Sequence, residues 1–225
     1  MSHFLKDFLF LGFIVWQSYE EVGVSQVKKE FAISLVSDWA VAEGFVKGRS
    51  DFVRKRGDFI DCISVQVSEN GDNVALNVGA HPVFLSDTDL WTVGALHEFS
   101  EIDCYIRNRL ALGGEPDFWI SLGLDGAVLE ADLKTLLDVA GAAFFKQISS
   151  VNFLVKSLTI ENISSRLLPD CFGVITKSRL ALLGVRANMT VGDVVTAREI
   201  AEYGLSICGM AVALKRDFKK LLSCL

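Results

Sequence analysis

The first clear pattern along the chain is a recurrence of hydrophobic residues every three to four positions. From Ser25 to Ala42 the apolar positions fall on one helical face, and Gly44 follows as a candidate C-cap. Beyond this glycine the apolar positions alternate with polar ones, which is typical of a strand with one buried face. The pattern therefore predicts an amphipathic helix followed by a sheet.

Short turns separate the alternating segments. Arg56-Gly57-Asp58 has the composition of a hairpin turn, and Glu69-Asn70-Gly71-Asp72 supplies a second turn. Both connections are too short for a parallel crossover, so we expect antiparallel pairing. The predicted strands are Asp51 to Arg56, Phe59 to Val67, Asn73 to Gly79 and Ile102 to Leu110.

The second half of the chain returns to helical spacing. A long apolar stripe predicts a helix from Leu129 to Leu158, and a further helix is expected to stop at Gly184. Thr190 and Asp193 have the spacing of a capping box, which opens a helix that can extend to Leu222. The fold class is therefore α+β: an antiparallel sheet of about four strands packed by helices, with a helical C-terminal extension.

The same pattern divides the chain into three segments. We expect an apolar N-terminal segment over residues 1–24, an α+β core domain over 25–158, and a helical extension packed on the core over 159–225. The apolar run from Phe8 to Trp16 is shorter than the roughly 20 residues that span a bilayer. We favour a segment docked on the core; a secretory signal is the alternative, although Asp7 interrupts its basic flank.

Charge narrows the classes of partner. The net charge of −6 argues against a dedicated nucleic-acid-binding protein. Between Ser86 and Asp132 there are ten acidic residues and two basic ones. This stretch forms either a solvated acidic surface or a binding surface for a basic protein. The expected partner contacts in this stretch are Asp87, Asp89, Glu98, Glu101, Glu115 and Asp117.

Reactive constellations are scarce in this sequence. The five cysteines form no CxxC pair and have no histidine at zinc-ligand spacing, so we expect reduced core thiols, no metal site and a cytoplasmic location. No glycine-rich phosphate loop, GxSxG or HExxH motif is present, and no cofactor is expected. His97 beside Glu98 can act as a general base only if a nucleophile lies within reach, so we favour a structural histidine.

One strand carries a distinctive group of polar side chains. Tyr105, Arg107 and Arg109 would share one face of the predicted fourth strand. Two guanidiniums and a phenol on one face can hold a carboxylate or a phosphate. The arginines can equally pair with acids inside the molecule, and we favour that structural interpretation.

Several sequence segments, taken in order, resemble a known family. They are Gly44-Phe45 after the first helix, FVRKRGDFIDCISVQVS, ALNVGAH, DCYIRNRL, and Trp119 followed by a long helix. Together they resemble a bacterial family catalogued as domain of unknown function 4304, over roughly residues 27–156. The resemblance implies an antiparallel sheet packed by helices. By association with other small orphan domains, it also implies a candidate immunity protein encoded beside a toxin.

Two hypotheses of function follow. The first is a cytoplasmic protein-binding module without catalytic activity, most concretely an immunity protein that neutralises a cognate, basic bacterial toxin by direct binding. The alternative is a domain that binds an anionic small molecule, or an enzyme of unknown reaction, through the face formed by Tyr105, Arg107 and Arg109. A deep pocket at those residues favours the second hypothesis, and a flat or convex acidic face favours the first.

Overall fold

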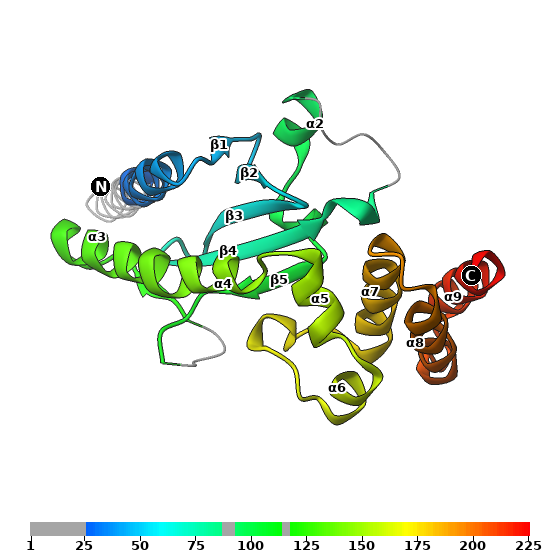
Figure 1. Cartoon of the computed structure of the whole chain (residues 1–225). Helices are drawn as coiled ribbons and strands as arrows, with labels where there is room; N and C mark the ends of the chain where they lie inside the picture. The colour runs from blue at the N-terminus through cyan, green and yellow to red at the C-terminus, as the bar shows by residue number, and fades with distance from the viewer. Residues whose placement is uncertain (1–25, 87–92, 114–117) are drawn as a thin grey trace, which may run out of the picture.

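The computed structural model of the protein describes residues 26–86, 93–113 and 118–225 (Figure 1). The expected N-terminal segment over residues 1–24 lies outside these ranges. Among the helices within them, none is both long enough and apolar enough to cross a bilayer.

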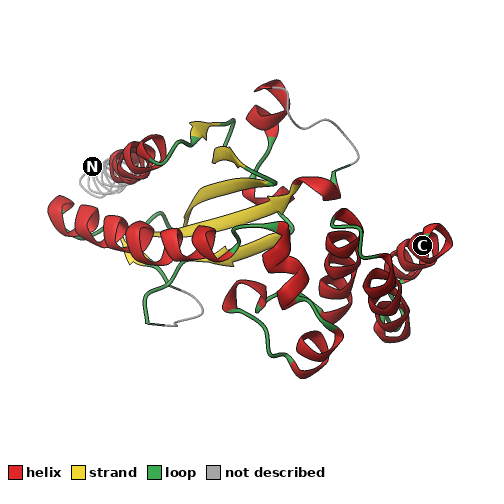
Figure 2. Cartoon of the chain, in the orientation of Figure 1, coloured by secondary structure: helices red, strands yellow, loops and turns green. Residues whose placement is uncertain are grey.

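An antiparallel sheet forms the centre of the fold, as the alternation predicts (Figure 2). The strands follow one another in the order β1-β2-β3-β4-β5, and β6 pairs with the start of β4. Gly57 and Gly71, in the two predicted turns, both have positive φ values, of 56° and 77°. The strands are β1 (Val46–Lys47), β2 (Phe52–Arg56), β3 (Phe59–Val67), β4 (Asn73–Pro82), β5 (Ile106–Arg109) and β6 (Ile120–Ser121).

The fifth strand is shorter than the alternation predicts. Its expected start at Ile102 is wrong, because Glu101–Asp103 forms a 3-10 helix, η2, in which Ile102 is 72% exposed. The Asp103 carboxylate accepts hydrogen bonds from the backbone N–H and the hydroxyl of Ser100, at 3.0 and 2.7 Å. These local bonds compete with strand pairing and delay the strand to Ile106.

Helices cover one face of the sheet. The helix over residues 26–42, called helix 26–42 below, ends before Gly44, as predicted, and lies on this face together with α3 and α4 (Figure 1). The other face carries a smaller apolar cluster of Val53, Ile60, Cys62, Phe99 and Cys104. The helices of the first two-thirds of the chain are η1 (Val83–Leu85), α2 (Val93–Glu98), α3 (Gly126–Thr135), the π-helical η3 (Leu136–Gly141) and α4 (Ala142–Gln147).

The predicted single helix from Leu129 to Leu158 is interrupted. Residues 126–147 are continuously helical, but Ile148 leaves the helical conformation with φ −88° and ψ 64°. The Ser150 hydroxyl then accepts a hydrogen bond from Phe153 N at 3.2 Å and starts a new helix. The elements that follow are α5 (Val151–Ser157), α6 (Ile160–Ser165) and the 3-10 helix η4 (Asp170–Phe172).

Three longer helices complete the chain: α7 (Lys177–Thr190), α8 (Val194–Ile207) and α9 (Val212–Cys224). The expected stop at Gly184 is wrong, because α7 continues through this residue. A Cβ at Gly184 would lie 3.1 Å from the Leu158 carbonyl oxygen and 3.6 Å from Ile200 Cγ2. The glycine therefore permits close approach of neighbouring segments rather than ending the helix.

The start of α8 also differs from the prediction. Asp193 is the N-cap: its carboxylate accepts a hydrogen bond from Thr196 N at 3.0 Å, which lowers the pKa of Asp193. Thr190 instead belongs to the last turn of α7. The helix does not reach Leu222, because it ends at Ile207 and Gly209 adopts a φ of 53°.

Buried residues of the sheet, of α3 and of the C-terminal helices belong to one continuous apolar cluster. It extends from Phe52 and Leu76 in the sheet, through Leu133 in α3, to Leu183 in α7 and Ile200 in α8. Because this cluster is continuous, the C-terminal helices are packed on the rest of the molecule through its main core.

Candidate functional site

Four of the six predicted partner contacts, Asp87, Asp89, Glu115 and Asp117, lie outside the described residues. The fifth, Glu98, is exposed at the end of α2 and forms an ion pair with Arg49, with 3.3 Å between Nη1 and Oε2. An exposed pair of this kind contributes little to stability, and its carboxylate remains accessible.

The sixth predicted contact, Glu101, is held inside the molecule. Its side chain is almost fully buried and accepts two hydrogen bonds from Arg107, at 2.6 Å from Nε and 3.0 Å from Nη2. The Glu101 backbone N–H donates to the buried carboxylate of Asp51 at 2.7 Å. Glu101 therefore anchors η2 to the sheet and is not accessible to a partner.

The three predicted ligand-binding side chains contact different parts of the molecule. Tyr105 precedes β5, and its hydroxyl donates to the Arg179 carbonyl oxygen of α7 at 2.6 Å. Burial raises the pKa of Tyr105, so the phenol stays protonated at neutral pH. Arg107 is paired with Glu101.

Arg109 lies on the face of the sheet opposite to helix 26–42, α3 and α4. Its guanidinium donates to Asn77 Oδ1 at 3.2 Å and to Gln66 Oε1 at 2.7 Å, and it lies 4.7 Å from the ring centre of Trp119. The three predicted ligand-binding side chains are therefore not assembled into one site.

Two further ionisable groups, His81 and Cys104, have structural surroundings. His81 contacts the Asp103 carbonyl oxygen through Nδ1 and the Ser86 hydroxyl through Nε2, both at 3.1 Å. Burial raises the pKa of Cys104 well above its ordinary value, so this thiol is a small core side chain rather than a nucleophile. Within the described ranges, no three His, Cys, Asp or Glu side chains are grouped so that they could hold a metal ion.

A different surface combines apolar and acidic side chains. Helix 26–42 lies beside the continuous helix formed by α3 and η3: Phe31 Cε1 is 3.6 Å from the position that a Cβ would take on Gly126, and the Trp39 indole donates to Asp138 of η3 at 2.7 Å. Because the earlier residue of each helix meets the earlier residue of the other, the two helices run parallel. Their outward faces are called the helix-pair surface below.

Large apolar side chains remain exposed where this helix pair begins. Val27 lies one turn before Phe31, and Leu124 and Val128 flank Gly126, which Phe31 contacts. These four apolar side chains are between 37% and 65% exposed. Several large exposed apolar side chains on neighbouring elements commonly mark an interaction site.

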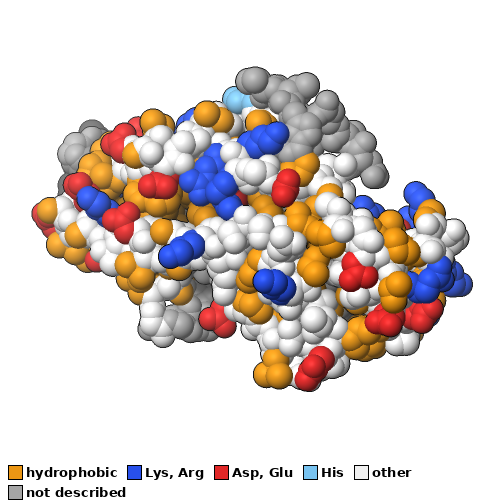
Figure 3. Space-filling model, in the orientation of Figure 1, with side chains coloured by type: hydrophobic (Ala, Val, Ile, Leu, Met, Phe, Trp, Pro, Cys, Tyr) orange, Lys and Arg blue, Asp and Glu red, His pale blue; other side chains and the backbone are white. Residues whose placement is uncertain are grey.

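Acidic side chains border this apolar group. Acidic and hydrophobic side chains lie interspersed over the end of the molecule where α3 begins (Figure 3). The helix pair also carries three lysines, the partly buried Lys28 and Lys29 and the exposed Lys134, and the exposed acids outnumber them. The exposed acids of the helix pair are Glu30, Asp38, Asp125, Glu130, Asp132 and Asp138.

Residues 37–144 match the family described as Domain of unknown function (DUF4304). This matched segment is called the DUF4304 domain below. The predicted resemblance is thereby confirmed over a narrower range than residues 27–156. Among curated proteins and among solved structures, none matches the chain.

The DUF4304 domain contains the sheet, α3, the start of α4 and residues 37–42 of helix 26–42. Part of the helix-pair surface lies within it, including Asp125, Val128, Glu130 and Asp132. Its three acids belong to the acidic stretch between Ser86 and Asp132, and they lie in α3 or, for Asp125, at its N-cap. Helix α3 is too short for the spacing of its apolar residues to show, from the sequence alone, which residues face outward.

His81, within the DUF4304 domain, supports a prediction about pH. Burial lowers its pKa from the ordinary value of 6.5, so the unfolded chain binds a proton more readily than the folded one. The stability from neutral His81 is present above that ordinary value and is lost as the pH falls through the lower, folded value. We expect His81→Gln to reduce the loss of unfolding free energy between about pH 7.5 and about pH 5.

Urea unfolding at a series of pH values measures this loss. His97→Gln, which replaces an exposed histidine of the same domain, is the control for removing an imidazole. If the His81→Gln protein loses as much stability on acidification as the parent, another group causes the pH dependence.

Proposed function

We propose that the protein is a protein-binding module that docks a basic, partly apolar surface of another protein on its helix-pair surface. The observation that carries the proposal is the exposed group of Val27, Phe31, Leu124 and Val128 with acidic side chains around it. Protein interfaces have this arrangement, in which an apolar centre loses its water on binding and a polar border stays hydrated.

The charge of this surface supports the choice of partner. Acidic side chains attract a basic protein during diffusion and raise the association rate, while like-charged proteins are repelled. A bacterial toxin with a basic surface is the partner class that we favour, which makes the protein an immunity protein that neutralises the toxin by direct binding. This finer proposal rests on charge complementarity and on the association that the family resemblance implies. A cytoplasmic location is part of it.

The product of the adjacent gene is the partner to test. We expect Val128→Asp to weaken its binding about tenfold or more, because the substitution puts a hydrated charge into the apolar centre of the interface. Val174→Asp is the matched control, since Val174 is 74% exposed but lies beyond α6, away from the helix pair. Surface plasmon resonance gives the dissociation constants, and thermal melts show whether both variants are folded.

Charge reversal separates steering from apolar contact. Lysines in place of Asp125, Glu130 and Asp132 are expected to slow association and to flatten its dependence on ionic strength. The proposal fails if the neighbouring product does not bind, or if Val128→Asp binds as tightly as Val174→Asp.

A further inference from the structure

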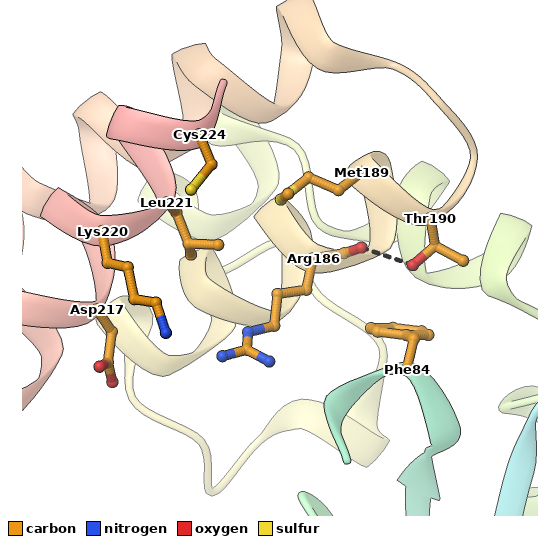
Figure 4. Close-up of a pocket in the computed structure, with 8 residues that line it drawn as sticks. All are labelled: Phe84, Arg186, Met189, Thr190, Asp217, Lys220, Leu221 and Cys224. Atoms are coloured by element: carbon orange, nitrogen blue, oxygen red, sulfur yellow. Dashed lines mark hydrogen bonds between the residues drawn. The ribbon is translucent and has the colours of Figure 1, made fainter. Parts of the chain in front are cut away.

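A pocket of about 460 Å³ lies between the DUF4304 domain and the C-terminal helices (Figure 4). Phe84 of η1 forms one side, and α7 contributes Arg186 and Met189. The opposite side belongs to α9, with Asp217, Lys220 and Leu221. This volume falls within the range of pockets that hold small molecules.

Arg186 is the unusual residue of this pocket. Its Nε is buried, and no hydrogen-bond partner for it exists among the described residues. A buried N–H without a partner is costly, and a ligand that accepts its hydrogen bond removes that cost. The planar guanidinium matches a carboxylate, which can accept two parallel hydrogen bonds from it.

Lys220 adds a second positive charge to the same space. Figure 4 shows that the Lys220 ammonium and the Arg186 guanidinium point into the same space, and that the ring of Phe84 lies on the other side of Arg186. Neither side chain forms an ion pair with any described residue. Asp217 lies on the same wall, so the charges of these three residues sum to +1.

The net charge of the pocket determines which ligand charge it favours. A single negative charge neutralises the pocket, whereas a doubly charged phosphate would leave it with a net negative charge. The side chains of Phe84, Met189 and Leu221 supply apolar walls for the rest of the ligand. We propose that this pocket binds a small monocarboxylate with an apolar body.

The proposal gives α9 a role in ligand binding that is separate from the docking of a protein on the helix-pair surface. This helix packs on α8 through the fully buried Phe218 and brings Lys220 to within one turn of that contact. The pocket is therefore complete only when α9 is docked.

Octanoate and phenylacetate are the probes for this pocket, and amide chemical shifts of the full chain are the readout. We expect saturable shifts at residue 84, at 186–190 and at 217–224, and none with the uncharged octanamide. Arg186→Met should weaken octanoate binding about tenfold or more, because the methionine keeps the apolar stem and removes the guanidinium. Lys220→Met should also weaken it.

Lys219→Met is the matched control, because Lys219 is the exposed neighbour of Lys220 on α9 and does not line the pocket. We expect it to bind octanoate as the parent does. Thermal melts identify a loss of folding, and the exposed position of Lys220 keeps the test valid if Arg186→Met is unstable. The proposal is overturned if neither probe gives saturable shifts up to about 10 mM. It is also overturned if inorganic phosphate binds equally well, or if Lys220→Met binds as Lys219→Met does.

Discussion

Replacement of Asp61 by alanine is expected to lower the free energy of unfolding by about 3–5 kcal/mol. The Asp61 carboxylate is fully buried on the helix-covered face of the sheet. It accepts hydrogen bonds from Arg54 Nε at 3.0 Å and from Arg56 Nε and Nη2 at 2.7 and 3.1 Å. Removing it leaves the Arg56 guanidinium without its anion, and it leaves Arg54 with only the longer ion pair to the exposed Glu43, at 3.7 Å.

The two arginines cannot simply turn to solvent, because other contacts hold them under the helices. The Arg54 guanidinium lies 4.3 Å from the ring centre of Phe45, and Arg56 donates to the Ile148 carbonyl oxygen at 2.8 Å. Both cations therefore remain where desolvation is costly.

Asp58→Ala is the matched control for this prediction, since Asp58 is an exposed acid in the same hairpin. Urea unfolding of the two variants measures the difference between them. A loss below about 1 kcal/mol for Asp61→Ala would place this cluster with ordinary surface ion pairs and contradict the prediction.

Gly204→Ala is expected to lower the free energy of unfolding by about 2 kcal/mol. A Cβ at this position in α8 would overlap the ring of Phe218, which is fully buried in α9. Alanine favours the helical state over glycine by about 1 kcal/mol, which offsets only part of the cost of the overlap. The two helices must therefore move apart.

A double-mutant cycle tests the proposed cause. Phe218→Leu removes part of the ring, so the two substitutions together should destabilise the protein less than the sum of their separate effects, by about 1 kcal/mol. Chemical unfolding of the two single variants and of the double variant gives this coupling. Strict additivity would show that the cost of Gly204→Ala arises elsewhere.

Local sequence determined the helix ending before Gly44 and the order of the first three main strands. Gly57 and Gly71 mark turns because their positive φ values are easy for glycine, and alternation of apolar residues shows that one face of each strand is buried. These signals act over a few neighbouring residues, so they can be recognised before the chain is folded.

Predictions failed where the same residue is compatible with more than one local structure. Gly184 looks like a helix stop, yet it permits close approach of Leu158, and that contact depends on how distant segments pack. The start of β5 moved to Ile106 because side-chain hydrogen bonds at Ser100 stabilise η2 in place of strand pairing. In both cases competing structures of similar energy were available.

The candidate sites were decided by tertiary structure alone. Arg186 and Lys220 meet because α9 folds back along α8 and α7, and helix 26–42 joins α3 although nearly a hundred residues separate Trp39 from Asp138. Asp61 differs from these sites, because it lies opposite Arg54 across the predicted hairpin, and the local sequence therefore brings it near both arginines. Periodicity reports which face of a segment is buried, but not which distant side chains it meets, because those contacts depend on the packing of the whole chain.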